Sequence, residues 1–421
     1  MMGHKMRRLK YLCAIKTGGT PSGNEGINYD SDGLPWYTPA DFSPTLMLTS
    51  AERWIDSQII KKDKIRVFPQ GSVYLVGIGA TVGKIGYCEQ EAYSNQQVTA
   101  LIPFDIASKF LLYSLHAKAS YIKDNALYTT LPIINNSYIS NLMVNLPTLS
   151  EQKAIADFLD VGCSKIDSII ADKEKQIEIL KSYKKRVIFH AVTKGLDGRV
   201  ELKDSNVDWI GRIPKHWSKN KIKYIATLKG RIGWQGLTSE EYRSEGAYLI
   251  TGTDFIDGKV NWKTCVCVDI KRWIEARDIQ VKNGDLLITK DGTVGKLAIV
   301  DGLTSEASLN SGVLRITLNK ENDTKFLYWV LGSNVFWGWF SDQNAGNSTI
   351  VHLYQNDFNN FAYMIPPLEE QQAIADHLDT ECARIDAIIK EKLAAVETMK
   401  SYKKSLIYEY VTGKRRIQEA Q

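Results

Sequence analysis

A long stretch of this chain occurs twice. Residues 146–193 and residues 365–412 align without a gap at an offset of 219 positions, and about half of the aligned residues are identical. Two copies are too few for a solenoid, in which several repeats stack to bury a continuous core. The repeat therefore indicates a duplicated unit and a molecule with pseudo-two-fold symmetry.

Each copy has the apolar spacing of a long helix that pairs through one narrow stripe. Apolar residues recur about every 3.5 positions between charged residues of both signs, which is typical of a coiled coil. About 40 residues in a helix would give a rod of roughly 60 Å. Packing of each helix on its own domain alone is the alternative. The predicted helix-pairing residues are Ile155, Leu159, Ile166, Ile170, Ile177 and Leu180 in the first copy and Ile374, Leu378, Ile385, Ile389, Val396 and Met399 in the second.

The connection between the copies favours antiparallel pairing. An antiparallel partner brings the start of the second helix next to the end of the first, so the linker has little distance to cover. Parallel helices would stretch the linker close to its limit of about 3.3–3.6 Å per residue. We therefore expect the two helices to run in opposite directions.

The segments before the helices also repeat, but more weakly. LKYLCAIK at 9–16 corresponds to IKYIATLK at 222–229, and ATVGK at 80–84 corresponds to GTVGK at 292–296. Such a pattern predicts a common scaffold with two different surfaces. We predict an α+β fold: two mixed α/β domains separated by two long helices that pair as an antiparallel coiled coil, the whole duplicated with pseudo-two-fold symmetry. The predicted boundaries are 1–145 for the first domain, 146–192 for the first helix, 193–214 for the linker, 215–364 for the second domain, 365–413 for the second helix and 414–421 for a tail.

Composition narrows the class of protein only a little. The net charge of +5 permits nucleic-acid binding without demonstrating it. No apolar run approaches about 18 residues, so no membrane span is predicted. The six scattered cysteines, with Cys163 and Cys382 at matching places in the repeat, indicate packing residues in a reducing cytoplasm. Cys265 and Cys267 have no second pair nearby, so no metal site is predicted.

No catalytic constellation stands out. GIGATVGKI resembles a phosphate-binding loop, but Ile78 and Ile85 occupy the positions that need Gly and Ser or Thr, and the second copy has Lys290 and Leu297 there. We interpret both segments as turns between strands. The six histidines show no metal-ligand pairing, and no methyltransferase Pro-Pro-aromatic motif is present.

The remaining signal points to binding. The divergent segments carry aromatic, amide and basic residues, Gln97 among the amides, which can read base edges or contact phosphates. Each of these residues alone is more often a plain surface or turn residue, and Tyr37 and Trp234 could equally belong to the core. The DNA-binding candidates are Lys16, Thr17, Tyr37, Thr81, Lys84, Asn95, Gln96, Arg231, Trp234, Gln235, Lys290, Thr293, Lys296 and Asn310.

The motifs resemble one known family. Both helices begin with Pro-x-Leu-x-Glu-Gln-x-x-Ile-Ala-like segments (147–156 and 366–375) and carry Ser-Tyr-Lys-Lys near their ends (182–185 and 401–404). With Gly-Arg-Ile-Pro-Lys-His-Trp at 211–217 and Asp-Gly-Thr-Val-Gly-Lys at 291–296, the chain is similar to specificity subunits of type I restriction–modification systems. The first repeat lacks the Ile-Pro-x-x-Trp entry of the second.

The resemblance implies a non-catalytic subunit with two target-recognition domains, each reading one half of a split, asymmetric double-stranded DNA sequence. The helices would set the unread spacer and bind two methyltransferase subunits, and restriction subunits would join the complex. The chain itself would bind no cofactor. S-adenosylmethionine would belong to the methyltransferase, and ATP and Mg²⁺ to the restriction subunit. An unrecognised nuclease and a coiled-coil scaffold that binds only proteins are the alternatives.

Overall fold

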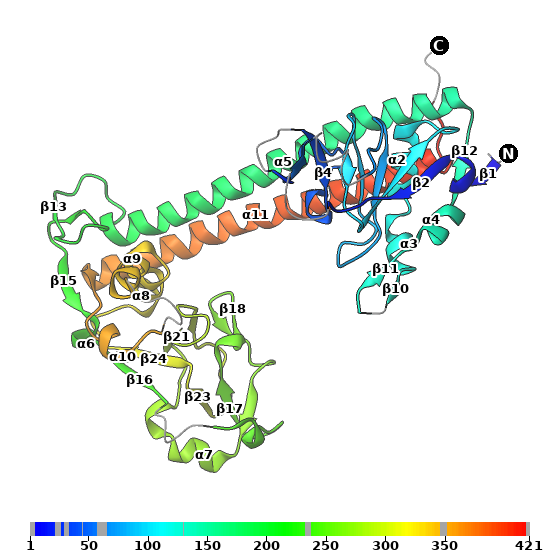
Figure 1. The fold of residues 1–421 in the computed structure, drawn as a ribbon. Helices are drawn as coiled ribbons and strands as arrows, with labels where there is room; N and C mark the ends of the chain where they lie inside the picture. The colour runs from blue at the N-terminus through cyan, green and yellow to red at the C-terminus, as the bar shows by residue number, and fades with distance from the viewer. Residues whose placement is uncertain are drawn as a thin grey trace. The chain divides into compact units, whose positions relative to one another are not determined.

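The chain folds into two compact units (Figure 1). A computed structural model describes residues 5–21, 27–28, 33–43, 45–56, 65–128, 130–231, 237–345 and 352–417. Unit 1 comprises Met1–Lys175 and Lys392–Gln421, and unit 2 comprises Gln176–Glu391. Each unit holds one mixed α/β domain and about half of each of the two long helices, α5 (Leu149–Lys194) and α11 (Leu368–Val411).

The domain of unit 1 is built on two four-stranded sheets. The main sheet is antiparallel and has the order β2 (Cys13–Thr17), β9 (Val98–Pro103), β6 (Val73–Val76), β7 (Ile85–Tyr87). The second sheet has the order β3 (Ile27–Asn28), β5 (Trp54–Ile55), β4 (Leu34–Tyr37), β8 (Tyr93–Ser94). Shorter elements complete the unit: β1 (Lys5–Arg8) with β12 (Met143–Leu146), β10 (Leu127–Tyr128) with β11 (Pro132–Ile133), helices α2 (Ser108–His116), α3 (Ala119–Asp124) and α4 (Asn136–Asn141), and 3-10 helices η1 (Leu9–Tyr11) and η2 (Pro39–Asp41).

The two central strands of the main sheet are buried on both faces. Leu75 and Leu101 belong to an apolar cluster with α2, α5 and α11, whereas Tyr74 and Ala100 belong to a second cluster on the opposite face. Successive side chains of a strand point to opposite faces. Burial on both sides explains why these strands are nearly continuous apolar runs without polar alternation.

The domain of unit 2 repeats the main sheet and extends it. Its six strands have the order β16 (Ala226–Gly230), β24 (Val313–Leu318), β21 (Leu286–Thr289), β22 (Leu297–Ile299), β19 (Lys259–Val260), β18 (Phe255–Ile256). A three-stranded sheet has the order β20 (Val266–Val268), β17 (Ala247–Ile250), β23 (Ala307–Leu309). The first four strands of the larger sheet occur in the same order as the main sheet of unit 1.

The other elements of unit 2 are short. They are the strand pairs β13 (Leu202–Asp204) with β14 (Arg212–Pro214) and β15 (Ser218–Lys221) with β25 (Ala362–Ile365), helices α6 (Ile222–Ile225), α7 (Ile270–Glu275), α8 (Thr324–Leu331), α9 (Asn334–Gln343) and α10 (Gln355–Phe358), and 3-10 helices η4 (Ser239–Glu241), η5 (Gly252–Asp254) and η6 (Arg277–Ile279). The segment between α5 and β15 is anchored to the unit. Trp217 is buried, and the indole of Trp209 donates to the carbonyl oxygen of Val335 at 3.2 Å.

A buried glutamine fastens each domain to the start of its long helix. The Oε1 atom of Gln152 accepts from the backbone N–H of Ala107 at 2.8 Å, and its Nε2 atom donates to the carbonyl oxygen of Pro147 at 2.9 Å. Gln371 makes the equivalent bonds to Asp323 and Pro366, each at 2.9 Å. A buried amide is retained only when its donors and acceptor are satisfied. The repeated Glu-Gln of the sequence is therefore a docking element.

An aspartate two turns further along each helix provides a second fastening. Asp160 accepts from the Nζ of Lys109 at 2.8 Å and from the hydroxyl of Tyr113 at 2.7 Å, both on α2. In unit 2 the equivalent Asp379 accepts from Lys325 at 2.7 Å and from the indole of Trp329 at 2.9 Å, both on α8. The hydrogen bond to Asp160 is the main reason why the pKa of Lys109 is raised.

The two long helices pack in opposite directions within each unit. In unit 1, Phe158 packs against Tyr410 at 4.6 Å between ring centroids, and further along α5 Asp167 pairs with Lys403 at 2.7 Å. The partner number falls as the α5 number rises, which defines antiparallel helices. In unit 2, Lys184 pairs with Asp386 at 2.5 Å, the pseudo-symmetric equivalent of the Asp167–Lys403 pair. The predicted fold of two mixed α/β domains with two long paired helices is confirmed.

Most of the residues predicted to pair the helices are buried within unit 1 or unit 2. Ile155, Leu159 and Ile166 share an apolar cluster with the end of α11, and Ile374 and Leu378 share another with the end of α5. The same clusters also contain side chains of the domains. The stripe therefore serves both predicted purposes, contact with the partner helix and contact with the domain. Ile177, Ile385 and Val396 are buried as well, whereas Ile170, Leu180, Ile389 and Met399 are half-buried.

Candidate nucleic-acid interface

In unit 1 the ends of the main-sheet strands gather several candidate residues at one edge. The chain leaves β2 at Thr17, and Gly18 and Gly19 donate their backbone N–H groups to Val98 and Ser94 at 3.1 and 2.8 Å. The turn after β6 joins them, because the N–H of Gly77 donates to the carbonyl oxygen of Gln97 at 2.8 Å. We call this surface edge 1 and define it as residues 16–20, 77–81 and 95–97. It contains the candidates Lys16, Thr17, Thr81, Asn95 and Gln96.

Edge 1 is ordered by a network of amides and hydroxyls. The Nδ2 atom of Asn136 donates to the hydroxyl of Thr17 at 2.9 Å, and its Oδ1 atom accepts from Thr99 at 3.2 Å. Asn95 is mostly buried and bonds twice to Gln97, through its Oδ1 to the backbone N–H and through its Nδ2 to Oε1, each at 3.0 Å. Gln96 is exposed and accepts from the hydroxyl of Thr20. Apart from the exposed Lys16, the edge thus presents neutral donors and acceptors.

Sequence reasoning missed two members of this network, Thr99 and Asn136. Thr99 lies on β9, directly after the turn that contains Asn95, Gln96 and Gln97, and Asn136 is the first residue of α4. Asn136 is distant in sequence from β2, and no local pattern places it beside Thr17. The adjacent SNQQVT run (94–99) was a signal that could have found Thr99.

The equivalent edge of unit 2 is dominated by charged groups. The N–H of Lys290 donates to Gly312 at 2.8 Å, and the N–H of Leu353 donates to the carbonyl oxygen of Lys290 at 2.9 Å. The Nδ1 atom of His352 lies 2.7 Å from Oδ1 of Asp291, and the Nζ of Lys290 lies 3.7 Å from Oδ2 of that carboxylate. We call residues 229–231, 290–296, 310–312 and 352 edge 2. It contains the candidates Arg231, Lys290, Thr293, Lys296 and Asn310.

The two Val-Gly-Lys turns are structural connections at these edges. Gly83 and Gly295 have φ angles of 85° and 86°, a left-handed conformation that suits glycine. A Cβ at Gly83 would lie 3.2 Å from the carbonyl oxygen of Ala119, and one at Gly295 would lie 2.5 Å from the ring of Trp337. The glycines therefore let each turn pack against a helix. Lys84 and Lys296 are exposed, and the Nζ of Lys84 donates to the carbonyl oxygen of Phe42 at 2.8 Å.

Two predicted DNA-binding residues lie in the interior, so that prediction is wrong for them. Tyr37 is fully buried against Tyr74, and its hydroxyl donates to the carbonyl oxygen of Leu48 at 2.9 Å. Arg231 is 5% exposed, and its Nε donates to the carbonyl oxygen of Leu309 at 2.8 Å. In both cases another segment of the chain, Leu48 after η2 for Tyr37 and β23 for Arg231, supplies a backbone acceptor that the sequence pattern does not reveal. The candidates Trp234 and Gln235 lie outside the described residues.

Within the described ranges, no three His, Cys, Asp or Glu side chains are arranged to hold a metal ion. Every helix among the described residues is too short or too polar to cross a bilayer. Cys163 and Cys382 are buried in the apolar clusters, and burial raises the pKa of each thiol to about 11.

The duplicated scaffold with two unlike edges matches a known family. A family model described as the type I restriction modification DNA specificity domain matches residues 1–179 and again residues 214–398. The chain belongs to this family. It is a specificity subunit of a type I restriction–modification system, the DNA-recognition part of the complex and not one of its enzymes.

Several relatives have a similar sequence. The type I restriction enzyme MjaVIII specificity subunit of Methanocaldococcus jannaschii is 27% identical over 370 residues, which cover 86% of this specificity subunit and 84% of that protein. The EcoBI specificity subunit of Escherichia coli is 24% identical over 366 residues, with 82% and 74% coverage. Both alignments include most of both chains.

Two solved structures share the fold. A chain from a structural study of complex assembly and conformational transition in a type I R-M system has a TM-score of 0.75 and 14% identity, and 99% of each chain is covered. The HsdS subunit from Thermoanaerobacter tengcongensis has a TM-score of 0.53 and 14% identity, with 99% and 98% coverage. At this identity the likeness concerns the fold.

Proposed function

We propose that the domains of units 1 and 2 are two target-recognition domains, each of which reads one half of a split, asymmetric sequence in double-stranded DNA. The observation that carries the proposal is the pair of edges. The same four-strand order places edge 1 and edge 2 at equivalent strand ends, while their side chains differ. Equivalent placement suits the same task, and different side chains suit different bases.

The side chains of edge 1 are suited to reading base edges. Gln96 and Gln97 carry amides, which can pair bidentately with adenine in the major groove. The bonds from Thr20 and Asn95 fix these amides, so little side-chain entropy remains to be lost on binding. Lys16 and the turn hydroxyls would contact phosphates and set the register.

Edge 2 offers a different set of groups. Lys290, Lys296 and Asn310 surround the His352–Asp291 pair. Lysine can donate to the O6 and N7 acceptors of guanine, and asparagine can pair with adenine. We propose Lys16, Thr17, Thr81, Lys84, Asn95 and Gln96 on unit 1 and Lys290, Thr293, Lys296 and Asn310 on unit 2 as the DNA-contacting residues.

The long helices provide two equivalent surfaces for a partner. Tyr183 and Tyr402 occupy the same place in the repeat and are 46% and 52% exposed, so packing within the subunit does not require their identity. A repeated exposed aromatic suits contact with the same kind of protein at both places. We propose that two methyltransferase subunits bind there and bring S-adenosylmethionine. Restriction subunits, with ATP and Mg²⁺, would complete the complex.

A base-resolution map of adenine methylation tests DNA reading. The map is recorded in the source cell with the gene, without it, and with a version in which Gln96 and Gln97 are alanine. We expect a bipartite motif to lose methylation in the deletion, and the double variant to relax one half of that motif. A Lys290→Ala/Asn310→Ala variant should relax the other half. Identical maps beside an active methyltransferase would refute the proposal and favour a protein-only scaffold.

Native mass spectrometry of the reconstituted complex tests partner docking. Tyr183→Ala and Tyr402→Ala should each weaken one of two methyltransferase contacts by about tenfold or more, as expected for a truncated aromatic anchor. The control is Ile179→Ala, because Ile179 is 56% exposed on the same helix and corresponds to Thr398 in the second copy. Loss of neither subunit in the double tyrosine variant would place the contact elsewhere.

A further inference from the structure

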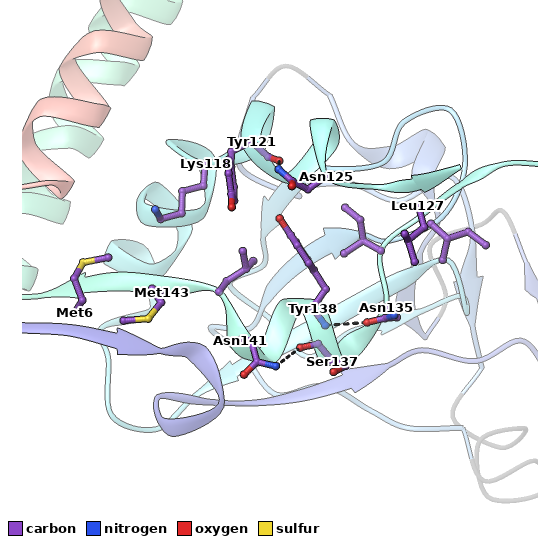
Figure 2. Close-up of a pocket in the computed structure, with 13 residues that line it drawn as sticks. Met6, Lys118, Tyr121, Asn125, Leu127, Asn135, Ser137, Tyr138, Asn141 and Met143 are labelled. Carbon is purple, nitrogen blue, oxygen red and sulfur yellow. Dashed lines mark hydrogen bonds between the residues drawn. The ribbon is translucent and has the colours of Figure 1, made fainter. Parts of the chain in front are cut away.

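Unit 1 has a cavity beside edge 1 that is separate from the larger one shown in Figure 2. The larger cavity has a mixed lining that includes Met6, Tyr121 and Asn141. The cavity beside edge 1 has a volume of about 440 Å³ and opens between the β6–β7 turn, the α2–α3 corner and the C-terminal part of α11. We call it the lysine cavity. Its lining residues are Ser43, Leu46, residues 80–85, His116, Ala119, Ser120, Lys123 and Lys404.

The polar lining of this cavity consists of cations and hydroxyls. Lys84, Lys123 and Lys404 contribute three ammonium groups, and no carboxylate is among the lining residues. Within the described part of the chain, none of these lysines has a carboxylate within ion-pair distance. Lys84 is held by the carbonyl oxygen of Phe42, which fixes its position without neutralising its charge. Such a lining favours an anion with several oxygen acceptors.

The environment of His116 supports a positive potential in the cavity. This half-buried imidazole on α2 faces Lys403 and Lys404 on α11, with Asp167 on α5 as the opposing charge. Burial first, and then the two lysines, lower the pKa of His116 to about 4. At neutral pH the ring is therefore uncharged and can donate or accept one hydrogen bond at each nitrogen.

The equivalent place in unit 2 keeps only part of these features. Lys296 and Lys185 are the counterparts of Lys84 and Lys404, whereas Gly332 occupies the position that corresponds to His116. Trp337 packs on Gly295 in the corresponding turn, and the remaining cavity of about 310 Å³ has Lys185 as its one lysine among the described lining residues. Among the described residues, a cavity that gathers three lysines is therefore found in unit 1 and not at this place in unit 2.

We propose that the lysine cavity binds a phosphate group, and specifically a backbone phosphate of DNA next to the half-site that edge 1 reads. Ala80 and Thr81 belong both to edge 1 and to the lining of the lysine cavity. A DNA strand bound at edge 1 would therefore continue past the entrance of the cavity. A phosphate contact there would fix the register of the duplex on unit 1. The DNA source rests on the proposed function, whereas the phosphate chemistry does not.

The first arm of the test uses inorganic phosphate as the probe and the full-length chain. The pKa of His116 is followed by NMR of the histidine rings, with His116→Gln to assign the signal. Bound phosphate should raise the pKa by about one unit or more, because a nearby anion favours the charged imidazole. The shift should saturate with phosphate and disappear in Lys123→Gln/Lys404→Gln. Lys185→Gln is the matched control and should keep it.

The second arm measures the affinity of the full-length chain for random-sequence duplex DNA at increasing salt. Each phosphate contact contributes about 0.9 to the slope of log K against log salt. The double lysine variant should lose about that amount, and Lys185→Gln should lose less. Retained melting temperature and circular dichroism establish that the variants fold.

The two arms separate the possible results. A saturable shift with a reduced slope supports the DNA phosphate. A saturable shift with an unchanged slope supports a phosphate site but overturns its DNA source in favour of a free phosphate or nucleotide. An absent shift with an unchanged slope overturns the proposal entirely. If the wild type binds no DNA, the proposed function fails while the phosphate arm still gives its answer.

Discussion

Units 1 and 2 differ least where each domain meets its long helix and most at the strand ends. Gln152 and Gln371 make the same pair of hydrogen bonds, and Asp160 and Asp379 each bind one lysine and one aromatic donor. The edges instead carry mainly amides and hydroxyls beside Lys16 in unit 1, and two lysines with a His–Asp pair beside Asn310 in unit 2. The comparison teaches that the duplication preserved how a domain is attached and changed what it presents.

The largest effect is expected from the buried leucines of the long helices. Leu159 and Leu378 occupy equivalent positions and are fully buried. Leu159→Ala and Leu378→Ala should each lower the free energy of unfolding by about 2–5 kcal/mol, because a cavity replaces packed methyl groups. Hydrogen exchange resolved by peptide should show the loss in unit 1 for the first variant and in unit 2 for the second.

The control for this prediction is an exposed leucine on the same helix. Leu393→Ala, at a position that is 49% exposed, should change the free energy by no more than about 0.5 kcal/mol. Loosening of both units by either core variant would contradict the separation of the two apolar clusters.

His116 should make unit 1 sensitive to acid in a way that unit 2 is not. Its pKa in the folded state is lowered from 6.5 to about 4, so the folded state favours the uncharged ring. The corresponding stability is complete above pH 6.5 and is lost as the pH falls from 6.5 toward 4, by an amount on the order of 2 kcal/mol. Denaturant unfolding of the wild type and His116→Gln between pH 7.5 and 4.5 measures it.

The variant should show a smaller loss over this range than the wild type. Hydrogen exchange should assign the difference to unit 1, because Gly332 stands at the equivalent place in unit 2. Parallel curves for the two proteins would mean that His116 does not contribute to the acid response.

Loss of the hydrogen bonds to Asp160 and Asp379 should lower the free energy of unfolding by a smaller amount, and the amount should differ slightly between the two units. Asp160→Asn and Asp379→Asn each remove a charged acceptor from a lysine and should cost about 1–2 kcal/mol. The effect should be larger at Asp160, because the side chain of its partner Lys109 is 33% exposed and that of Lys325 is 51% exposed. Thermal unfolding compares them with Asp157→Asn, a change at an exposed aspartate of α5.

A larger loss at Asp379 would contradict this order. Equal and negligible losses at both positions would mean that the buried glutamines alone hold each domain on its helix.

The sequence predicted the long helices, which are closely repeated, but it did not predict most contacts at the edges, where the two units differ. Residues 146–193 and 365–412 predicted the paired helices because their apolar period depends on local spacing. The reading edges depend on contacts between distant segments. Asn136 donates a hydrogen bond to Thr17, which is far from it in the sequence, and the guanidinium of Arg231 donates to a backbone oxygen of β23. Residue type alone therefore could not predict that Asn136 belongs to edge 1's network, or that Tyr37 and Arg231 are buried.

The smallest effect is expected at the ion pairs between the helices. Lys403 is 12% exposed and reaches both oxygens of Asp167 at 2.7 Å, whereas Lys184 is 25% exposed and pairs with Asp386, which is 56% exposed. Lys403→Met should cost about 1 kcal/mol and Lys184→Met about 0–0.5 kcal/mol, since solvent screens exposed pairs.

Chemical denaturation at pH 7.5 isolates the ion-pair term, because His116 is uncharged there in both the wild type and the variants. Lys403 also contributes to the lowered pKa of His116, so its removal should additionally weaken the acid response of unit 1. A double-mutant cycle with Asp167→Asn separates the two effects, since only the direct pair contributes to the coupling energy at pH 7.5. Equal costs at Lys403 and Lys184 would show that burial of the lysine does not decide the strength of these pairs.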